Sequence, residues 1–225
     1  MTARTILITG ANRGLGLALA QRYHAEGWRV LATCRKPRSA HALREIVEPL
    51  ELDVTAEASL RALSERLRGE PIDILFSNAG VFGPRGLAFA DLSREVWLEV
   101  LDVNAVAPVR LAQAFIDNVA KSQERLIAVM SSDLGSVANT VGGEVIYRTS
   151  KAALNMAVAT LAKDLEPRGV RTVAVSPGWV RTDMGGSEAA LSPEESARGI
   201  HTTLASLPRD TSGVFVKYDG SSVAW

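Results

Sequence analysis

Short apolar segments rich in β-branched residues alternate along this chain with longer segments of helical periodicity. Five segments have the clearest strand character: residues 5–9, 29–33, 72–77, 126–131 and 170–176. A weaker strand is expected at 48–52 and a last one at 213–218. Parallel strands need a crossover connection, which is usually a helix, so this alternation is typical of a parallel sheet. We therefore predict an α/β fold, a doubly wound Rossmann domain with a mainly parallel seven-stranded sheet.

The intervening segments predict helices that cover both faces of this sheet, at residues 14–26, 57–68, 95–121, 147–166 and 193–206. Pro108 interrupts the longest of them shortly after Asn104. Proline lacks an amide donor and clashes with the preceding turn, so we expect a kink or break there. With 225 residues, 47% of them hydrophobic, the chain is expected to form one domain over residues 1–225.

Charge and cysteine content exclude several classes of function. Lys plus Arg and Asp plus Glu both total 25, so no net charge favours nucleic acid or a membrane surface. The single cysteine, Cys34, rules out an internal disulfide framework. The three histidines, His24, His41 and His201, lack metal-ligand spacing, and we predict no metal site. Without a signal-like or membrane-length apolar run, the expected location is the cytoplasm.

A glycine-rich turn follows the first predicted strand and opens the first predicted helix. Such a turn brings backbone amides and the positive helix end to a pyrophosphate. Its spacing, Gly-x-x-x-Gly-x-Gly, differs from the more widespread Gly-x-Gly-x-x-Gly pattern. We predict that the turn binds a dinucleotide through Thr9, Gly10, Asn12, Arg13, Gly14, Leu15 and Gly16.

Tyr147 and Lys151 are spaced four residues apart in a predicted helix, so their side chains project from one face. An unperturbed tyrosine titrates near ~10, and a neighbouring cation favours the phenolate. The pair therefore predicts a general acid or base. The alternative interpretation is an amphipathic helix in which Tyr147 is half-buried and Lys151 is solvated.

These two motifs together resemble the short-chain dehydrogenase/reductase superfamily, and the resemblance spans almost the whole chain. Further residues fall where it predicts them: Asn78-Ala79-Gly80, Asn104, Ser131-Ser132 and Pro177-Gly178. Within the superfamily, the chain is most similar to C-factor-like and sniffer-type carbonyl reductases. That similarity rests on Tyr147-Arg148-Thr149-Ser150-Lys151, on residues 177–186 and on Tyr218-Asp219-Gly220.

The resemblance implies reversible hydride transfer between a nicotinamide and a small carbonyl or alcohol substrate. Tyr147 would supply the proton, Ser132 would hydrogen-bond the substrate oxygen, and Lys151 would bind the nicotinamide ribose and lower the pKa of Tyr147. Asn104 would hold a water relay, or else be a satisfied amide at the helix break. Ser132 is preferred as the second serine of its pair, but three other hydroxyl residues remain possible: Ser131, Ser136 and Thr140.

The choice of cofactor depends on the end of the second strand, where a basic residue accommodates a 2′-phosphate. Arg35 stands there, and with Arg13 it favours NADP(H), although NAD(H) stays possible and both could be solvated loop cations. Asp53, followed by Val54, would lie near the adenine or else cap the next helix. The remaining cofactor residues that the resemblance implies are Asn78, Ala79, Gly80, Pro177, Gly178, Val180 and Thr182.

The resemblance also implies a substrate lid at residues 183–191 and a homodimer or homotetramer that pairs helices 95–121 and 147–166. Lid mobility is expected, although a passive surface loop is the alternative. A rival function is a regulatory or signalling protein that binds NADP(H) with little turnover. The intact set of Asn104, Ser132, Tyr147 and Lys151 favours an enzyme, because a sensor need not keep a proton donor.

Overall fold

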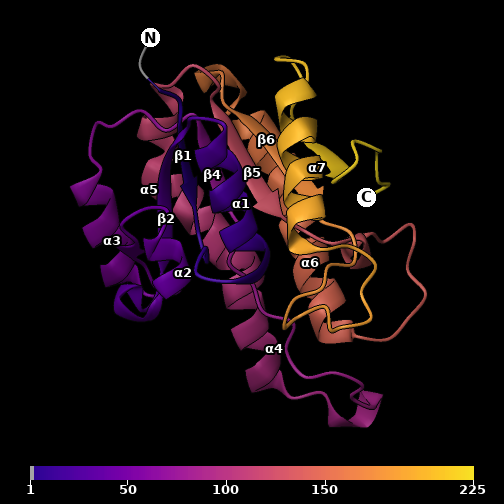
Figure 1. Cartoon of the computed structure of the whole chain (residues 1–225). Coiled ribbons are helices and arrows are strands. Elements are labelled where there is room, and N and C mark those ends of the chain that lie inside the picture. Colours follow the sequence, from indigo (N-terminus) through magenta and orange to yellow (C-terminus); the bar gives the residue numbers. More distant parts are fainter. Residues whose placement is uncertain (1–2) are drawn as a thin grey trace.

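All seven strands of the computed structural model, which describes residues 3–225, belong to one parallel sheet (Figure 1). Their spatial order is β3-β2-β1-β4-β5-β6-β7. The strands are β1 (Thr5–Ile8), β2 (Arg29–Cys34), β3 (Leu50–Glu51), β4 (Ile74–Ser77), β5 (Leu126–Met130), β6 (Arg171–Ser176) and β7 (Val214–Lys217). The predicted fold class is confirmed, and the weak strand expected at 48–52 is the shortest of the seven.

Helices pack on both faces of the sheet. They are α1 (Gly14–Ala25), α2 (His41–Arg44), α3 (Glu57–Arg66), α4 (Arg94–Leu101), α5 (Ala107–Ala120), α6 (Val145–Asp164) and α7 (Pro193–Ser206). The start of α7 follows its sequence closely, because Ser192 and Glu195 form a capping box. The four-residue helix α2 was not predicted, since so short a segment shows no helical periodicity.

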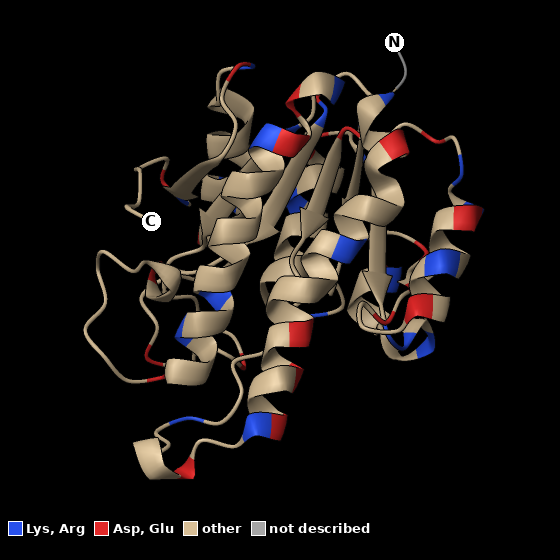
Figure 2. Cartoon of the chain, turned by 180° about the vertical axis from the view of Figure 1, so that it is seen from behind, with Lys and Arg blue, Asp and Glu red and all other residues tan. Residues whose placement is uncertain are grey.

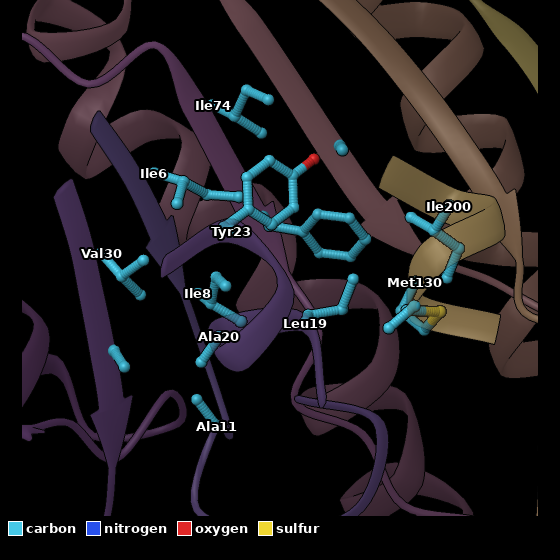
Figure 3. Close-up of a cluster of buried hydrophobic side chains, with 14 of the residues drawn as sticks. Ile6, Ile8, Ala11, Leu19, Ala20, Tyr23, Val30, Ile74, Met130 and Ile200 are labelled. Atoms are coloured by element: carbon cyan, nitrogen blue, oxygen red, sulfur yellow. The ribbon is translucent and has the colours of Figure 1, made fainter. Parts of the chain in front are cut away.

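The two faces of the sheet bury separate apolar clusters, because successive strand residues point to opposite sides. In β1, Ile6 and Ile8 contribute to the cluster under α1 and α7, whereas Leu7 belongs to the cluster under α3, α5 and α6. Tyr23 of α1 is the largest fully buried side chain of the first cluster and lies beside Ile6 and Ile74 (Figure 3). Both clusters are built from strand residues that alternate in this way.

The long helix predicted at 95–121 is interrupted. A π-helical segment, Asp102–Val106, separates α4 from α5, and the amide of Ala107 donates to the carbonyl oxygen of Asp102. Pro108 lies in the first turn of α5 and cannot donate to the carbonyl oxygen of Asn104. The break is therefore present, and it falls in the turn that contains Asn104.

Strand order reverses direction between β1 and β4, which makes this the topological switch point of the sheet. In open α/β sheets, ligands bind outside the carboxyl ends of the strands at that point. Over the outer helices, basic and acidic residues are interspersed (Figure 2). Among residues 3–225, no helix combines the length and apolar character needed to cross a membrane. The topology thus directs attention to the loops that follow β1, β4, β5 and β6.

Candidate active site

The glycine-rich turn packs too tightly to carry side chains at its key positions. Gly10 adopts a left-handed conformation with φ of +65°, and a Cβ on Gly16 would collide with the carbonyl oxygen of Gly10. The side-chain amide of Asn78 fills the space beside Gly16 and donates to the carbonyl oxygens of Thr9 (2.9 Å) and Gly10 (3.2 Å). This packing fixes where helix α1 begins.

The amino end of α1 is suited to an anion. Within the described residues, Arg13 makes no side-chain capping bond there, and the first turn holds no acidic residue. The first amides of a helix lack partners inside the helix, and its dipole favours negative charge. The residues present therefore fit the pyrophosphate of a dinucleotide.

Three residues that the sequence assigned to the cofactor bind one another in the structure. The hydroxyl of Thr9 accepts hydrogen bonds from the amides of Asn78 (3.0 Å) and Ala79 (3.1 Å). Through these hydrogen bonds, the three residues join the loop after β1 to the loop after β4. Asn12 and Arg13 stay exposed at the tip of the turn, and Leu15 is half-buried.

Asn104 is fully buried in the π-helical segment and ties three parts of the site together. Its side-chain oxygen accepts from the amide of Val81 (2.9 Å), and its side-chain nitrogen donates to the carbonyl of Val81 (2.8 Å) and to the hydroxyl of Ser150 (3.0 Å). A Cβ on Gly80 would lie 3.2 Å from Asn104 Oδ1 and 3.6 Å from Lys151 Nζ. Gly80 therefore lets the loop after β4 approach both residues.

Tyr147 and Lys151 lie together in α6, which begins at Val145, two residues earlier than predicted. Tyr147 is 7% exposed and Lys151 4%, so the alternative with a solvated lysine is wrong. The ammonium of Lys151 donates to the carbonyl of Met130 (2.7 Å) and lies 5.8 Å from the centroid of the Tyr147 ring.

Burial dominates the protonation of both groups. It lowers the pKa of Lys151 to about 8. It also raises the pKa of Tyr147, an effect that the Ser132 hydroxyl and the charge of Arg85 only partly oppose. The groups that lower the pKa of Tyr147 are therefore Ser132 and Arg85, not Lys151 as expected, and the net shift is upward because desolvation of the phenolate outweighs them.

The four candidate hydroxyl residues have different surroundings. Ser131 donates to Asn155 Oδ1 (2.5 Å) inside the protein, and Ser136 donates to the carbonyl of Ala224 (2.7 Å). Thr140 is exposed. Ser132 is the one whose hydroxyl lowers the pKa of Tyr147, and this places it beside the phenol.

The basic residues predicted to bind a 2′-phosphate have acidic neighbours. Arg13 forms an ion pair with Asp183, and Arg35 is exposed near Asp53, where its charge helps to lower the pKa of that carboxyl group. The largest cause of the lowered Asp53 pKa is its bond from the Thr55 hydroxyl (2.8 Å). Asp53 does not cap the next helix, because Ala56 occupies that position. Val54, beside it, is half-buried.

The segment after β6 folds back on itself and approaches the glycine-rich turn. It begins with Pro177 and Gly178, and Val180 then forms a β-bridge with Leu191. The hydroxyl of Thr182 accepts from the amide of Gly185 (3.1 Å), and its methyl carbon would lie 3.2 Å from a Cβ on Gly14. We use "lid" for residues 183–191, which lie opposite the turn.

A stack above Tyr147 was missed by the sequence analysis. The ring of Phe82 lies over that of Tyr147, with centroids 4.3 Å apart, and the Arg85 guanidinium lies 3.9 Å from the Phe82 centroid. Arg85 also donates to the carbonyl oxygen of Met184 in the lid. An aromatic residue just after Asn78-Ala79-Gly80 is the only signal for this stack in the sequence, and it matches no motif that we used.

Comparisons with known proteins agree with this geometry. Residues 4–191 match the short chain dehydrogenase family. The chain is 40% identical over 167 residues to C-signal of Myxococcus xanthus, covering 74% of this chain and all of that protein. It superposes on the carbonyl reductase Sniffer of D. melanogaster with a TM-score of 0.93 at 35% identity, and on a short-chain dehydrogenase/reductase of Burkholderia multivorans with bound NADP, with a TM-score of 0.91 at 36% identity. Both superpositions cover each chain completely. The chain therefore belongs to the short chain dehydrogenase family and is an oxidoreductase that acts on carbonyl and hydroxyl groups.

Proposed function

We propose that this protein is an NADP(H)-dependent carbonyl reductase. One observation carries the proposal: Asn104, Tyr147 and Lys151 are buried together beside Ser132, at the strand ends next to the uncapped start of α1. A buried phenol and a buried ammonium at the mouth of a dinucleotide turn are costly to maintain for stability alone. Their arrangement suits proton transfer to a bound carbonyl.

The cofactor would lie across the carboxyl ends of β1 and β4. The amides at the start of α1 would bind its pyrophosphate, and Arg35 would pair with a 2′-phosphate. Arg13 can join Arg35 only by leaving Asp183. The NADP bound by the Burkholderia protein supports this assignment, and NAD(H) is the alternative that the titration below separates. When bound, the nicotinamide supplies or accepts the hydride.

Each residue of the cluster has a separate task in reduction. The phenol of Tyr147, with its pKa above the usual tyrosine value, is protonated at neutral pH and can donate its proton to the carbonyl oxygen. Ser132 would donate a hydrogen bond to the same oxygen as negative charge develops. Lys151, with a pKa of about 8, would bind the ribose and hold positive charge near the phenolate that forms. Asn104 would position the loop at Val81 and a proton relay.

We further propose a homodimer or homotetramer formed through α4, α5 and α6. Three large apolar side chains are exposed in and between these helices: Leu98 and Met156 are 47% and 68% exposed, and Val106, the last residue of the π-helical segment, is 47% exposed. Exposed apolar clusters often mark interfaces between proteins. Light scattering on the purified protein should therefore give at least twice the chain mass, and a monomer at micromolar concentration would contradict this proposal.

The proposed reaction is tested by titrating purified protein with NADPH and with NADH while nicotinamide fluorescence is recorded. A panel of aldehydes, ketones and quinones is then added, and loss of nicotinamide absorbance is followed. The proposal expects tighter binding of NADPH and turnover of at least one carbonyl. Binding without turnover of any carbonyl would favour the sensor interpretation, and failure to bind either nucleotide would overturn the proposed site.

A further inference from the structure

A cavity lies at the end of the sheet opposite the candidate active site. It has a volume of about 380 Å³, and its lining includes Arg4, which precedes β1, and the first residues of two strands, Ile74 of β4 and Leu126 of β5. The active-site residues follow the carboxyl ends of the same strands. A molecule in this cavity would therefore be separated from the nicotinamide by the length of the sheet. Its volume falls in the range of small-molecule sites.

Aromatic side chains form one wall of this cavity. Tyr23 meets Trp28 edge-on at 5.1 Å and His201 at 5.0 Å between ring centroids, and the Arg4 guanidinium lies 4.4 Å from the Trp28 ring. The indole N–H of Trp28 is buried and has no hydrogen-bond partner within the described part of the chain. Figure 3 shows the phenol oxygen of Tyr23 directed away from Ile6. The indole nitrogen can only donate, so it would be satisfied by a ligand that supplies an acceptor.

The charges that line the cavity are balanced, but two of its guanidinium groups share one carboxylate. Two guanidinium groups and two carboxylates line the cavity, those of Arg4, Arg209, Glu26 and Glu124. Behind them, Arg22 pairs with Glu26 at 2.6 Å and Arg171 lies 3.9 Å from Glu124, while Asp210 lies near Arg171. Arg22 thus neutralises Glu26, whereas Arg4 and Arg209 share the single carboxylate of Glu124. The Asp73 carboxylate, which accepts from the amides of Thr5 (2.8 Å) and Glu124 (3.3 Å), lies behind this group. His201 adds no charge at neutral pH, because burial and Arg22 lower its pKa.

We propose that this cavity is a second ligand site, and that it binds a small aromatic carboxylate. The aromatic ring of the ligand would pack on the wall formed by Tyr23 and Trp28, where flat rings meet at low entropic cost. Its carboxylate would reach Arg4 and Arg209, which share the carboxylate of Glu124 at 3.5 and 3.0 Å. Both guanidinium groups have donors beyond those that Glu124 uses.

The site is tested with 2-naphthoate as the probe, titrated by calorimetry into the full chain saturated with NADPH. Ala205 lines the cavity yet is exposed, so Ala205→Trp fills the mouth without disturbing the core. Thr202→Trp is the matched control, because Thr202 is exposed on the same helix and does not line the cavity. We expect saturable binding in the wild type and in Thr202→Trp, with at least a tenfold loss in Ala205→Trp. Absent binding, or equal binding in both variants, would overturn the proposal.

Two further measurements locate the ligand and test its charge. In ¹H–¹⁵N spectra, 2-naphthoate should shift the indole N–H signal of Trp28 and leave that of Trp97, which donates to Thr149. Arg209→Gln should weaken 2-naphthoate several-fold without affecting the neutral 2-naphthamide. If the amide binds as tightly as the carboxylate, the assignment to an anionic ligand is wrong. If Trp97 shifts instead of Trp28, the site is wrong.

Discussion

The two walls of the candidate active site are held by different kinds of contact. On the wall formed by the π-helical segment and α6, the polar groups of Asn104, Ser150 and Lys151 are buried and bonded to one another or to backbone. On the lid wall, the Arg13–Asp183 pair joins side chains that are 69% and 78% exposed. Buried polar groups must be paired, whereas an exposed ion pair contributes about 0–1 kcal/mol. The wall with the buried, hydrogen-bonded groups is therefore held in one arrangement, and we call it the fixed wall. On the lid wall, the exposed side chains can exchange partners.

The largest expected effect is on the fixed wall, at Tyr147. Tyr147→Phe removes the proton donor and keeps the ring that stacks on Phe82. We expect kcat to fall by about 10²- to 10⁴-fold, the usual contribution of a general acid, while NADPH affinity stays within about twofold. Steady-state kinetics and fluorescence titration measure both. The control is Tyr23→Phe, a change at a buried tyrosine at the other end of the sheet, and retained turnover in Tyr147→Phe would defeat the proposed mechanism.

The second-largest effect is expected from Gly16→Ala, which tests whether the glycine-rich turn is held as rigidly as the fixed wall. In Gly16→Ala, the added Cβ collides with the carbonyl oxygen of Gly10, so the turn must move away from the pyrophosphate. Overpacking of about 2–3 kcal/mol should weaken NADPH binding by roughly 30- to 150-fold. Ala20→Gly in the same helix lowers stability without touching the turn. If both variants lose affinity equally, instability rather than turn geometry is the cause.

A smaller effect is expected at Arg35, which distinguishes the two cofactors. Arg35→Ala should weaken NADPH by about tenfold, the value of one charge-assisted hydrogen bond, and NADH by less than about twofold. Arg38→Ala is the matched control, since Arg38 is exposed three residues further along. Paired fluorescence titrations measure the NADPH and NADH affinities of the wild type and of both variants. Equal losses for NADPH and NADH would remove the reason to prefer NADP(H).

The smallest effect is expected on the lid wall. Asp183→Asn breaks the ion pair with Arg13 and frees that guanidinium for the cofactor. Because the pair is exposed, NADPH affinity should rise by only about two- to fivefold. Glu188→Gln removes a lid charge whose only described partner is its neighbour Ser187, and it should leave affinity unchanged. A loss of affinity in Asp183→Asn would mean that the lid pair supports cofactor binding instead of competing with it.

The difference between the two walls also explains which features of the fold and the site could be predicted from the sequence. The parallel sheet, the break near Pro108 and the placement of Tyr147 and Lys151 on one helix face follow from periodicity, backbone chemistry and residue spacing. The Arg13–Asp183 pair joins loops 170 residues apart, and the Phe82–Arg85 stack depends on the path of one loop. Neither leaves a periodic signal. The direction of the Tyr147 pKa shift also required the structure, because burial outweighs the charges near the phenol.

The π-helical segment between α4 and α5 also constrains how this chain can change in length. Residues in a regular helix are spaced by about 100° around its axis. A π turn holds one residue more than a regular turn, so loss of one residue between Asp102 and Val106 would close it to a regular turn, and would turn Asn104 away from the backbone of Val81. Deletions are normally tolerated best in loops, but here the middle of a helical stretch has a fixed residue count. In descendants of this gene, the number of residues in that segment should vary as little as the identity of Asn104.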